Sequence, residues 1–153
     1  KVTRHSIPAF LAFSAAQQDI SDNTFTKVQF NTEKYDVDGT YDNSTNYRFT
    51  PAVAGKYNLY AQVGAYGISN TSQDITIDIY KNGSSYVQQR QGFSDMAIQN
   101  GGTYSLHTSA TLISDADDYF EVYLKMNTNG VNARIDYNAS LLYTFFGGYK
   151  LIT

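Results

Sequence analysis

The side chains that could do chemistry are few and scattered in this sequence. It contains two histidines, His5 and His107, and no cysteine. The two histidines are far apart and neither stands at metal-ligand spacing, so a catalytic triad or a zinc site has little support. Nucleophile-elbow, phosphate-loop and zinc-protease motifs are also missing. The residues favour a protein that is not an enzyme; a glycosidase built on two carboxylates is kept as the third alternative.

Carboxylates gather in two segments that could offer oxygen ligands to calcium. One segment spans residues 36–42, and the other holds Asp115, Asp117 and Asp118. An EF-hand beginning in the first segment would need a glutamate where Tyr47 stands, so that interpretation fails. Calcium at Asp115, Asp117 and Asp118 stays open, against the alternative that both segments are ordinary solvated turns.

The composition predicts one folded domain over residues 1–153. The chain is 42% hydrophobic and 16% charged, which suits a sizeable core. A net charge of −3 and eleven scattered Lys and Arg residues give no basic surface, so nucleic acid is not an expected partner. No apolar run is long enough for membrane insertion. Because the chain begins at Lys1 without Met, we expect it to be a processed form or a cut piece of a longer polypeptide.

Four segments alternate between apolar and other residues with the period of a β-strand: residues 57–66, 75–80, 119–126 and 131–141. Clusters of Asn, Asp, Gly, Ser and Thr separate such runs, and helical periodicity is weak. The pair Asn82-Gly83 predicts a tight hairpin turn. We expect nine or ten antiparallel strands in an all-β sandwich or jelly roll.

Large rings lie on the strand faces that ought to meet water. One face of the 57–66 strand is regularly apolar, yet tyrosines also occur on the other. Each ring is worth roughly 1.5–3 kcal/mol when buried, so the sequence favours a second buried surface, such as a contact between subunits. The alternative is that these rings are singly exposed or lie on edge strands. Five tyrosines occur opposite aliphatic faces: Tyr60, Tyr66, Tyr80, Tyr119 and Tyr123.

Motifs along nearly the whole chain carry a family resemblance. Residues 41–57 read YDNSTNYRFTPAVAGKY, and they are the most specific stretch. Further matching segments follow in family order: residues 8–15, 27–31, 81–83, 110–112 and 145–149. On these residues the sequence resembles the C1q-like globular-head family, which is related in fold to tumour necrosis factor.

The resemblance implies a ten-stranded antiparallel jelly roll that assembles as a homotrimer, usually as the C-terminal head of a fibrous stalk. The sequence is most similar to family members from bacteria and their viruses. This similarity implies a tail-fibre component at a virion surface or an extracellular location. The resemblance places the trimer interface in a region whose candidate residues are Tyr57, Tyr60, Tyr66, Tyr119, Tyr123, Phe145, Phe146 and Tyr149.

Three polar loops could bind a ligand. Loops 67–73, 93–102 and 127–132 combine aromatic rings with Asn, Asp and Gln, a mixture that suits saccharides. The leading hypothesis is a trimeric recognition head that binds a host-surface glycan or a protein receptor, and the alternative is a structural trimerisation cap. The candidate ligand residues are Asn70, Gln73, Phe93, Asp95, Asn100, Asn127, Asn129 and Asn132. Glycosylation sequons begin at Asn43, Asn70, Asn82 and Asn138, although chance explains them about as well.

Overall fold

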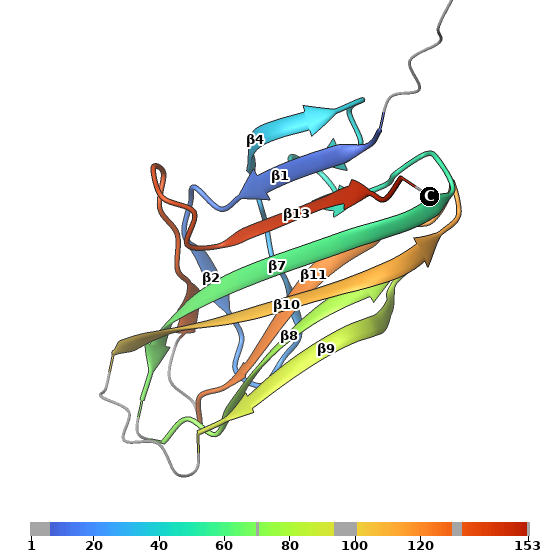
Figure 1. Cartoon of the computed structure of the whole chain (residues 1–153). Helices are drawn as coiled ribbons and strands as arrows, with labels where there is room; N and C mark the ends of the chain where they lie inside the picture. The colour runs from blue at the N-terminus through green and yellow to red at the C-terminus, as the bar shows by residue number, and fades with distance from the viewer. Residues whose placement is uncertain (1–6, 70, 94–100, 130–132, 153) are drawn as a thin grey trace, which may run out of the picture.

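The computed structural model describes residues 7–69, 71–93, 101–129 and 133–152. These residues form two antiparallel sheets packed face to face, with no helix in the described part of the chain (Figure 1). None of the described residues therefore belongs to a helix that could cross a membrane. The all-β sandwich predicted from the sequence is confirmed.

The larger sheet, called sheet A here, has seven strands. Its longest strand, β7, pairs with β10 on one side and with β12 and then β13 on the other. The chain of neighbours continues from β13 to β1 and β4, and from β12 to β2. The bounds are β1 Ala9–Phe13, β2 Gln18–Ile20, β4 Thr32–Val37, β7 Gly55–Ile68, β10 Gly102–Ser114, β12 Ala133–Ile135 and β13 Phe145–Lys150.

The smaller sheet, sheet B, has six strands in the order β5-β6-β11-β8-β9, and β3 also pairs with β11. Its central strands β8 and β11 pair over their full lengths. The bounds are β3 Thr26–Lys27, β5 Tyr41–Asp42, β6 Arg48–Phe49, β8 Asp74–Lys81, β9 Ser84–Gly92 and β11 Phe120–Asn127.

The described residues thus hold thirteen strands where nine or ten were expected, because several strands of two or three residues leave little periodic signal.

The core lies between the sheets and follows the predicted alternation. The odd residues of β7 from Tyr57 to Ala65, the three isoleucines of β8 and the even residues of β11 are all buried. Aromatic rings fill one part of this core, where Phe10 stacks on Phe49 at 4.4 Å and meets Phe146 edge-on at 4.9 Å. The core therefore accounts for one face of each strand and leaves the other faces to be explained.

Two local expectations have different outcomes. Asn82 and Gly83 take positive φ values of 51° and 78° and connect β8 to β9, as the Asn-Gly turn predicted. The strand predicted over residues 131–141 is corrected to Ala133–Ile135, with 131 and 132 outside the described residues. The reason is local: Asn138 Oδ1 accepts hydrogen bonds from the N–H groups of Ser140 and Leu141, which turns the chain out of the sheet.

Candidate recognition and assembly surfaces

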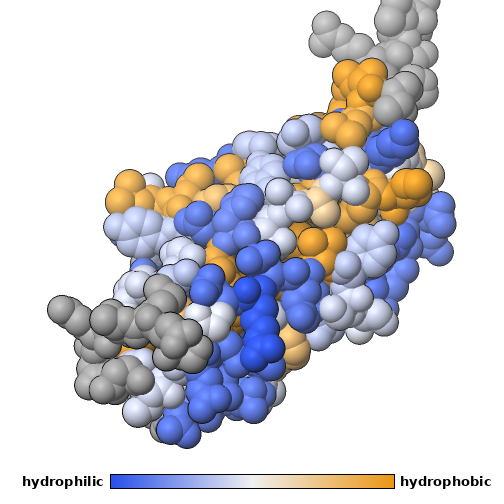
Figure 2. Space-filling view, turned by 60° about the horizontal axis from the view of Figure 1, so that its bottom comes forward, coloured by the Kyte–Doolittle hydropathy of each residue, from blue (hydrophilic) through white to orange (hydrophobic). Residues whose placement is uncertain are grey.

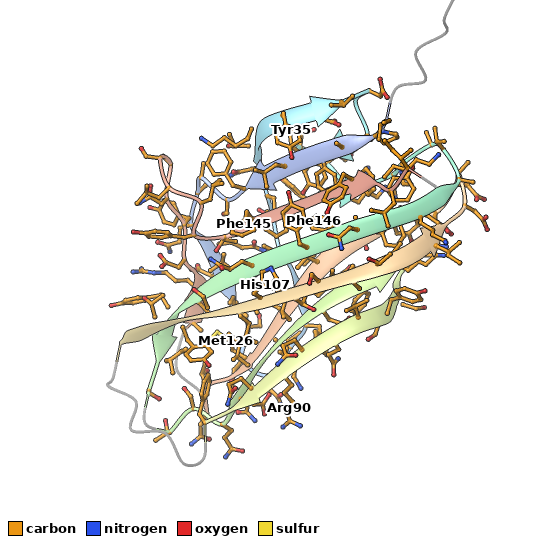
Figure 3. All side chains as sticks on the ribbon, viewed as in Figure 1. Tyr35, Arg90, His107, Met126, Phe145 and Phe146 are labelled. Carbon is orange, nitrogen blue, oxygen red and sulfur yellow. The ribbon has the colours of Figure 1, made fainter. Side chains whose placement is uncertain are left out.

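The outer face of sheet A carries a patch of aromatic side chains. Tyr35 on β4, Tyr60 on β7 and Phe145 and Tyr149 on β13 all point away from the core, as the strand pairing requires. Tyr35 and Tyr149 each remain 45% exposed. Figure 3 labels Tyr35 on β4 and Phe145 on β13, together with Phe146, the next residue of β13. We call these four residues the sheet A aromatic patch.

The patch is ordered by packing within the chain. A Cβ atom on Gly147 would lie 2.6 Å from Cζ of Tyr60, so the absence of a side chain there lets the Tyr60 ring lie flat on β13. The Tyr60 ring also meets Phe145 at a centroid distance of 6.3 Å. Burial, and then the adjacent Tyr35 hydroxyl, raise the pKa of Tyr60 to about 12. Contacts within the chain therefore hold Tyr60 and Phe145 in place, and the patch presents mainly ring surface.

Two residues assigned to the trimer interface belong instead to the core. Tyr57 and Phe146 are both fully buried between the sheets. The Tyr57 hydroxyl donates to the carbonyl oxygen of Val53 at 2.7 Å, which satisfies its polar end inside the chain. These assignments are corrected, because neither side chain can contact another molecule in the folded chain.

The remaining candidates for the interface divide between two sides of the sandwich. Tyr60, Phe145 and Tyr149 lie in the sheet A aromatic patch, and Tyr66 lies further along β7 with the Arg134 guanidinium 4.3 Å above its ring. Tyr119 and Tyr123 instead lie at and on β11 of sheet B. One flat contact surface cannot include both groups. Sequence periodicity distinguishes residues that face the core from residues that face outward. It does not tell which of the two sheets an outward residue belongs to.

The outer face of sheet B has a different character, because charged groups surround its rings. Tyr80 and Tyr123 stack at 4.1 Å, and Lys27 pairs with Glu121 beside them. Burial, followed by the Glu121 charge, raises the pKa of Tyr123 to about 12. Figure 2, which brings the bottom of the Figure 1 view toward the viewer, shows mainly hydrophilic groups on that side of the molecule, with hydrophobic groups in separate patches. These rings are partnered within the chain.

The carboxylates considered for calcium organise turns. Asp118 forms an ion pair with Lys81 Nζ at 2.7 Å and accepts hydrogen bonds from Asn82 Nδ2 and the Asp115 N–H. Burial raises the pKa of Asp118, but these donors outweigh burial and bring the pKa below its usual value. Asp115 and Asp117 are exposed. Within the described residues no group of three Asp, Glu, His or Cys side chains could hold a metal ion, and calcium stays an untested prediction.

The acidic segment 36–42 is also structural. Asp42 accepts hydrogen bonds from the N–H groups of Ser44, Thr45 and Asn46, which hold its pKa well below the usual range. Asp36 likewise accepts from the N–H groups of the two residues at 40 and 41. The 41–57 stretch that carries the resemblance thus begins with a turn organised by the Asp42 carboxylate.

The predicted ligand loops meet at one end of the sandwich. The Gln73 N–H donates to the Asn127 carbonyl and the Phe93 N–H donates to the Gln73 carbonyl, each at 2.8 Å. Gln73 and Asn129 are exposed and Asn127 is half-buried, but Phe93 is buried against Tyr104 and is therefore corrected to a core residue. Asn70, Asp95, Asn100 and Asn132 lie outside the described residues.

A fourth loop was missed by the sequence interpretation. Residues 137–143 expose four large side chains, namely Tyr137, Leu141, Leu142 and Tyr143. Buried Thr144 holds this loop, since its Oγ1 donates to the Asp136 carbonyl at 2.6 Å and accepts from the Gly64 N–H at 3.0 Å. The apolar run at 141–143 was the available signal, but only Leu141 was considered, as the last residue of the predicted 131–141 strand.

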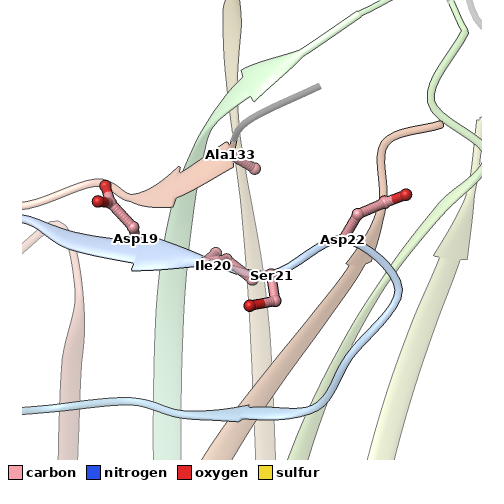
Figure 4. A pocket seen from close by; sticks show the side chains of 5 residues that line it. All are labelled: Asp19, Ile20, Ser21, Asp22 and Ala133. Atoms are coloured by element: carbon pink, nitrogen blue, oxygen red, sulfur yellow. The ribbon is translucent and has the colours of Figure 1, made fainter. Parts of the chain in front are cut away.

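A shallow pocket of about 350 Å³ lies where β2 meets β12. Figure 4 shows its lining side chains, which are Asp19, Ile20, Ser21, Asp22 and Ala133. Asp22 Oδ1 is engaged by the N–H and hydroxyl of Thr128. The described residues of its lining are mostly exposed and include no histidine or cysteine.

No protein family and no curated protein matches this chain by sequence. Solved structures do match it in fold. Eiger TNF from S. frugiperda superposes with a TM-score of 0.67 at 14% identity, covering 97% of this chain and 94% of the other. Murine APRIL gives 0.68 at 13% identity, with coverages of 95% and 99%. The globular domain of zebrafish complement 1qA protein gives 0.62 at 14%, with coverages of 95% and 98%.

These matches define the class of the domain. Two sheets in this arrangement, superposable over nearly the whole chain on a TNF, on APRIL and on a complement 1qA head, are a TNF/C1q-like jelly roll. At 13–14% identity the likeness shows the fold alone. The fold implied by the sequence resemblance is therefore confirmed.

Proposed function

We propose that the protein is a non-enzymatic recognition head that works as a homotrimer, with copies contacting one another through the outer face of sheet A. The observation that carries the proposal is the sheet A aromatic patch, a preordered apolar surface on one side of the sandwich. Surfaces of this kind mark contacts between proteins, where rings gain burial that the isolated chain cannot supply. The likeness to TNF/C1q-like domains supports a trimeric receptor-binding or ligand domain.

Recognition is assigned to the loops rather than to the sheets. The described parts of loops 67–73, 93–102 and 127–132 meet at one end, and loop 137–143 offers apolar side chains held in place by Thr144. Preordered loops lose little conformational entropy when they bind, which favours this role. We place the head outside the cell or on a virion fibre, where it binds a host glycan or protein receptor.

A structural trimerisation cap is the second candidate, because the same aromatic patch would serve it. The two functions separate when the loops are changed. Charge substitutions of Leu141 and Leu142 should abolish surface attachment and leave the trimer intact in a recognition head. In a pure cap those substitutions have no effect on attachment, while deletion of the domain leaves its stalk unassembled.

The test of assembly is the mass in solution by light scattering, with and without a chelator. A trimer gives a mass near three times 17.1 kDa. Tyr149→Lys, which places a charge in the patch, should yield monomers. Tyr86→Lys is the matched control, since Tyr86 is 52% exposed on β9 of the other sheet. A monomeric wild type, or equal behaviour of the two variants, would refute the proposed contact.

A further inference from the structure

Three side chains on the outer face of β8 are buried although they point away from the core. Asp74, Thr76 and Asp78 occupy the face opposite the buried isoleucines and are only 6%, 2% and 0% exposed. One oxygen of each, namely Asp74 Oδ1, Thr76 Oγ1 and Asp78 Oδ1, has no hydrogen-bond partner within the described part of the chain. We call these three atoms the β8 oxygen row. Buried polar atoms are rarely left in this state, so the row calls for a donor.

The partners of the two carboxylates all come from β9. Both carboxylates use their Oδ2 atoms on the β9 side, where Asp78 accepts from Ser85 Oγ at 2.6 Å and from Gln88 Nε2 at 2.9 Å. Asp74 Oδ2 pairs with Arg90 at 3.0 Å on the same side. Strand β11 supplies none of the described donors to the row. Each carboxylate therefore keeps one oxygen, and Thr76 its hydroxyl, without a donor from the described residues of either neighbouring strand.

The charges around the row decide which donor fits. Thr76 is flanked by Lys125 on β11 and by Arg90 on β9. These two cations disfavour a cationic ligand, and the carboxylates of Asp74 and Asp78 disfavour an anionic one. Neutral hydroxyl groups avoid both repulsions. Hydroxyl groups can donate hydrogen bonds to the oxygen row and accept one from Lys125 Nζ. In the unliganded chain Lys125 Nζ lies over the Phe25 ring, 5.3 Å from its centroid.

Aromatic surface borders the same place. Tyr123 is the β11 neighbour of Asp78, and it stacks on Tyr80, which in turn lies 6.2 Å from the Phe25 ring. Binding sites for small molecules combine apolar ring surface with a few placed polar groups. A bridging water would satisfy the oxygens but would make no use of these rings.

We propose that the outer face of sheet B binds a neutral saccharide at the β8 oxygen row. Sugar hydroxyls donate to Asp78 Oδ1 and Thr76 Oγ1, and the C–H face of the ring packs beside Tyr123. Lys125 moves off the Phe25 ring to admit the ligand and then donates to it. This site lies on the opposite side of the sandwich from the sheet A aromatic patch, so it does not depend on assembly.

The test is saturation-transfer NMR with lactose, maltose, mannobiose and diacetylchitobiose at millimolar concentrations. At least one sugar should give a saturable signal with the wild type. Thr76→Val should weaken its affinity about tenfold, the effect of one hydrogen bond. This variant keeps the fold, because the lost hydroxyl has no partner in the chain. Thr45→Val is the matched control, on an exposed turn, and should bind as the wild type does.

Two results would overturn the assignment. One is the absence of saturation transfer to any of the four sugars, which is expected if water alone fills the row. The other is equal sugar affinity of Thr76→Val and the wild type. The solution mass of each sample separates this proposal from the assembly. A monomer that binds sugar refutes the trimer and leaves the site standing, whereas a trimer that binds none does the reverse.

Discussion

Large outward side chains have different neighbours on the outer faces of the two sheets. On sheet A, Tyr60 lies over Gly147 and against the Phe145 ring, and Tyr149 on the same face stays half-exposed. On sheet B, Tyr80 and Tyr123 stack on each other among ion pairs, and the smaller polar residues of β8 are covered. An outward tyrosine thus suggests a contact between subunits only where its neighbours are apolar. Among charged neighbours the ring is packed against side chains of its own chain and does not by itself indicate such a contact.

The largest effect should separate the two sides of a single strand. Phe146→Ala empties a core position and should lower the free energy of unfolding by about 3–5 kcal/mol. Phe145→Ala, one residue earlier and facing outward, should cost less in folding and weaken assembly instead. Urea denaturation and light scattering at one protein concentration measure the two effects. Equal unfolding losses would show that the outer face of sheet A acts as part of the core.

Gly147→Ala should disturb the sheet A aromatic patch without opening the core. The new methyl group would lie 2.6 Å from the Tyr60 ring, which must tilt away, at a cost of about 1–3 kcal/mol. We expect the mass in solution to fall because the patch is no longer flat. Gly92→Ala is the control, since its Cβ would meet only the Gln73 carbonyl at 4.0 Å. A trimer that survives Gly147→Ala unchanged would contradict the proposed contact.

On sheet B the corresponding change should stabilise the protein. Thr76→Val replaces a buried hydroxyl without a partner by a methyl group of similar shape, and the free energy of unfolding should rise by about 1 kcal/mol. Thermal unfolding of the variant and the wild type measures this. A variant less stable than the wild type would mean that the hydroxyl has a partner in solution even without a ligand.

The smallest expected effect on stability concerns the ion pair between Asp118 and Lys81 and its dependence on pH. The pKa of Asp118 is lowered in the folded state, so its stabilisation is present above the unfolded pKa and is lost as pH falls through the folded pKa. The pKa of Lys81, raised chiefly by its hydrogen bond to Asp118, limits the effect at high pH, where its stabilisation is lost. Asp118→Asn should cost about 1 kcal/mol or less at neutral pH, because Lys81 is partly solvated.

Thermal midpoints measured from neutral pH down to about pH 3 test the sign. The difference between Asp118→Asn and the wild type should shrink as the wild-type carboxylate becomes protonated. A difference that stays constant over this range would show that the variant acts through the shape of the turn and not through the charge of Asp118.

The candidate site shows where periodicity stops being informative. It correctly placed Tyr57 inward and Tyr60 outward on β7, but the interface set drawn from the family resemblance still included Tyr57. Phe93 was taken for a loop residue because polar residues surround it in sequence, whereas it packs against Tyr104 on a distant strand. Such a contact joins residues that no local pattern connects.

Alternation and turn residues were enough to predict an all-β sandwich or jelly roll, its core faces and the Asn82-Gly83 turn, because these depend on a strand's period and on local hydrogen bonds. The choice of a jelly roll came from the family resemblance carried by the 41–57 motif. Which outward tyrosines share a surface was decided only when β7 joined sheet A and β11 joined sheet B. The β8 oxygen row is likewise invisible in the sequence, where Asp74, Thr76 and Asp78 look like solvent-facing residues. Their burial depends on the side chains that β9 and β11 bring alongside.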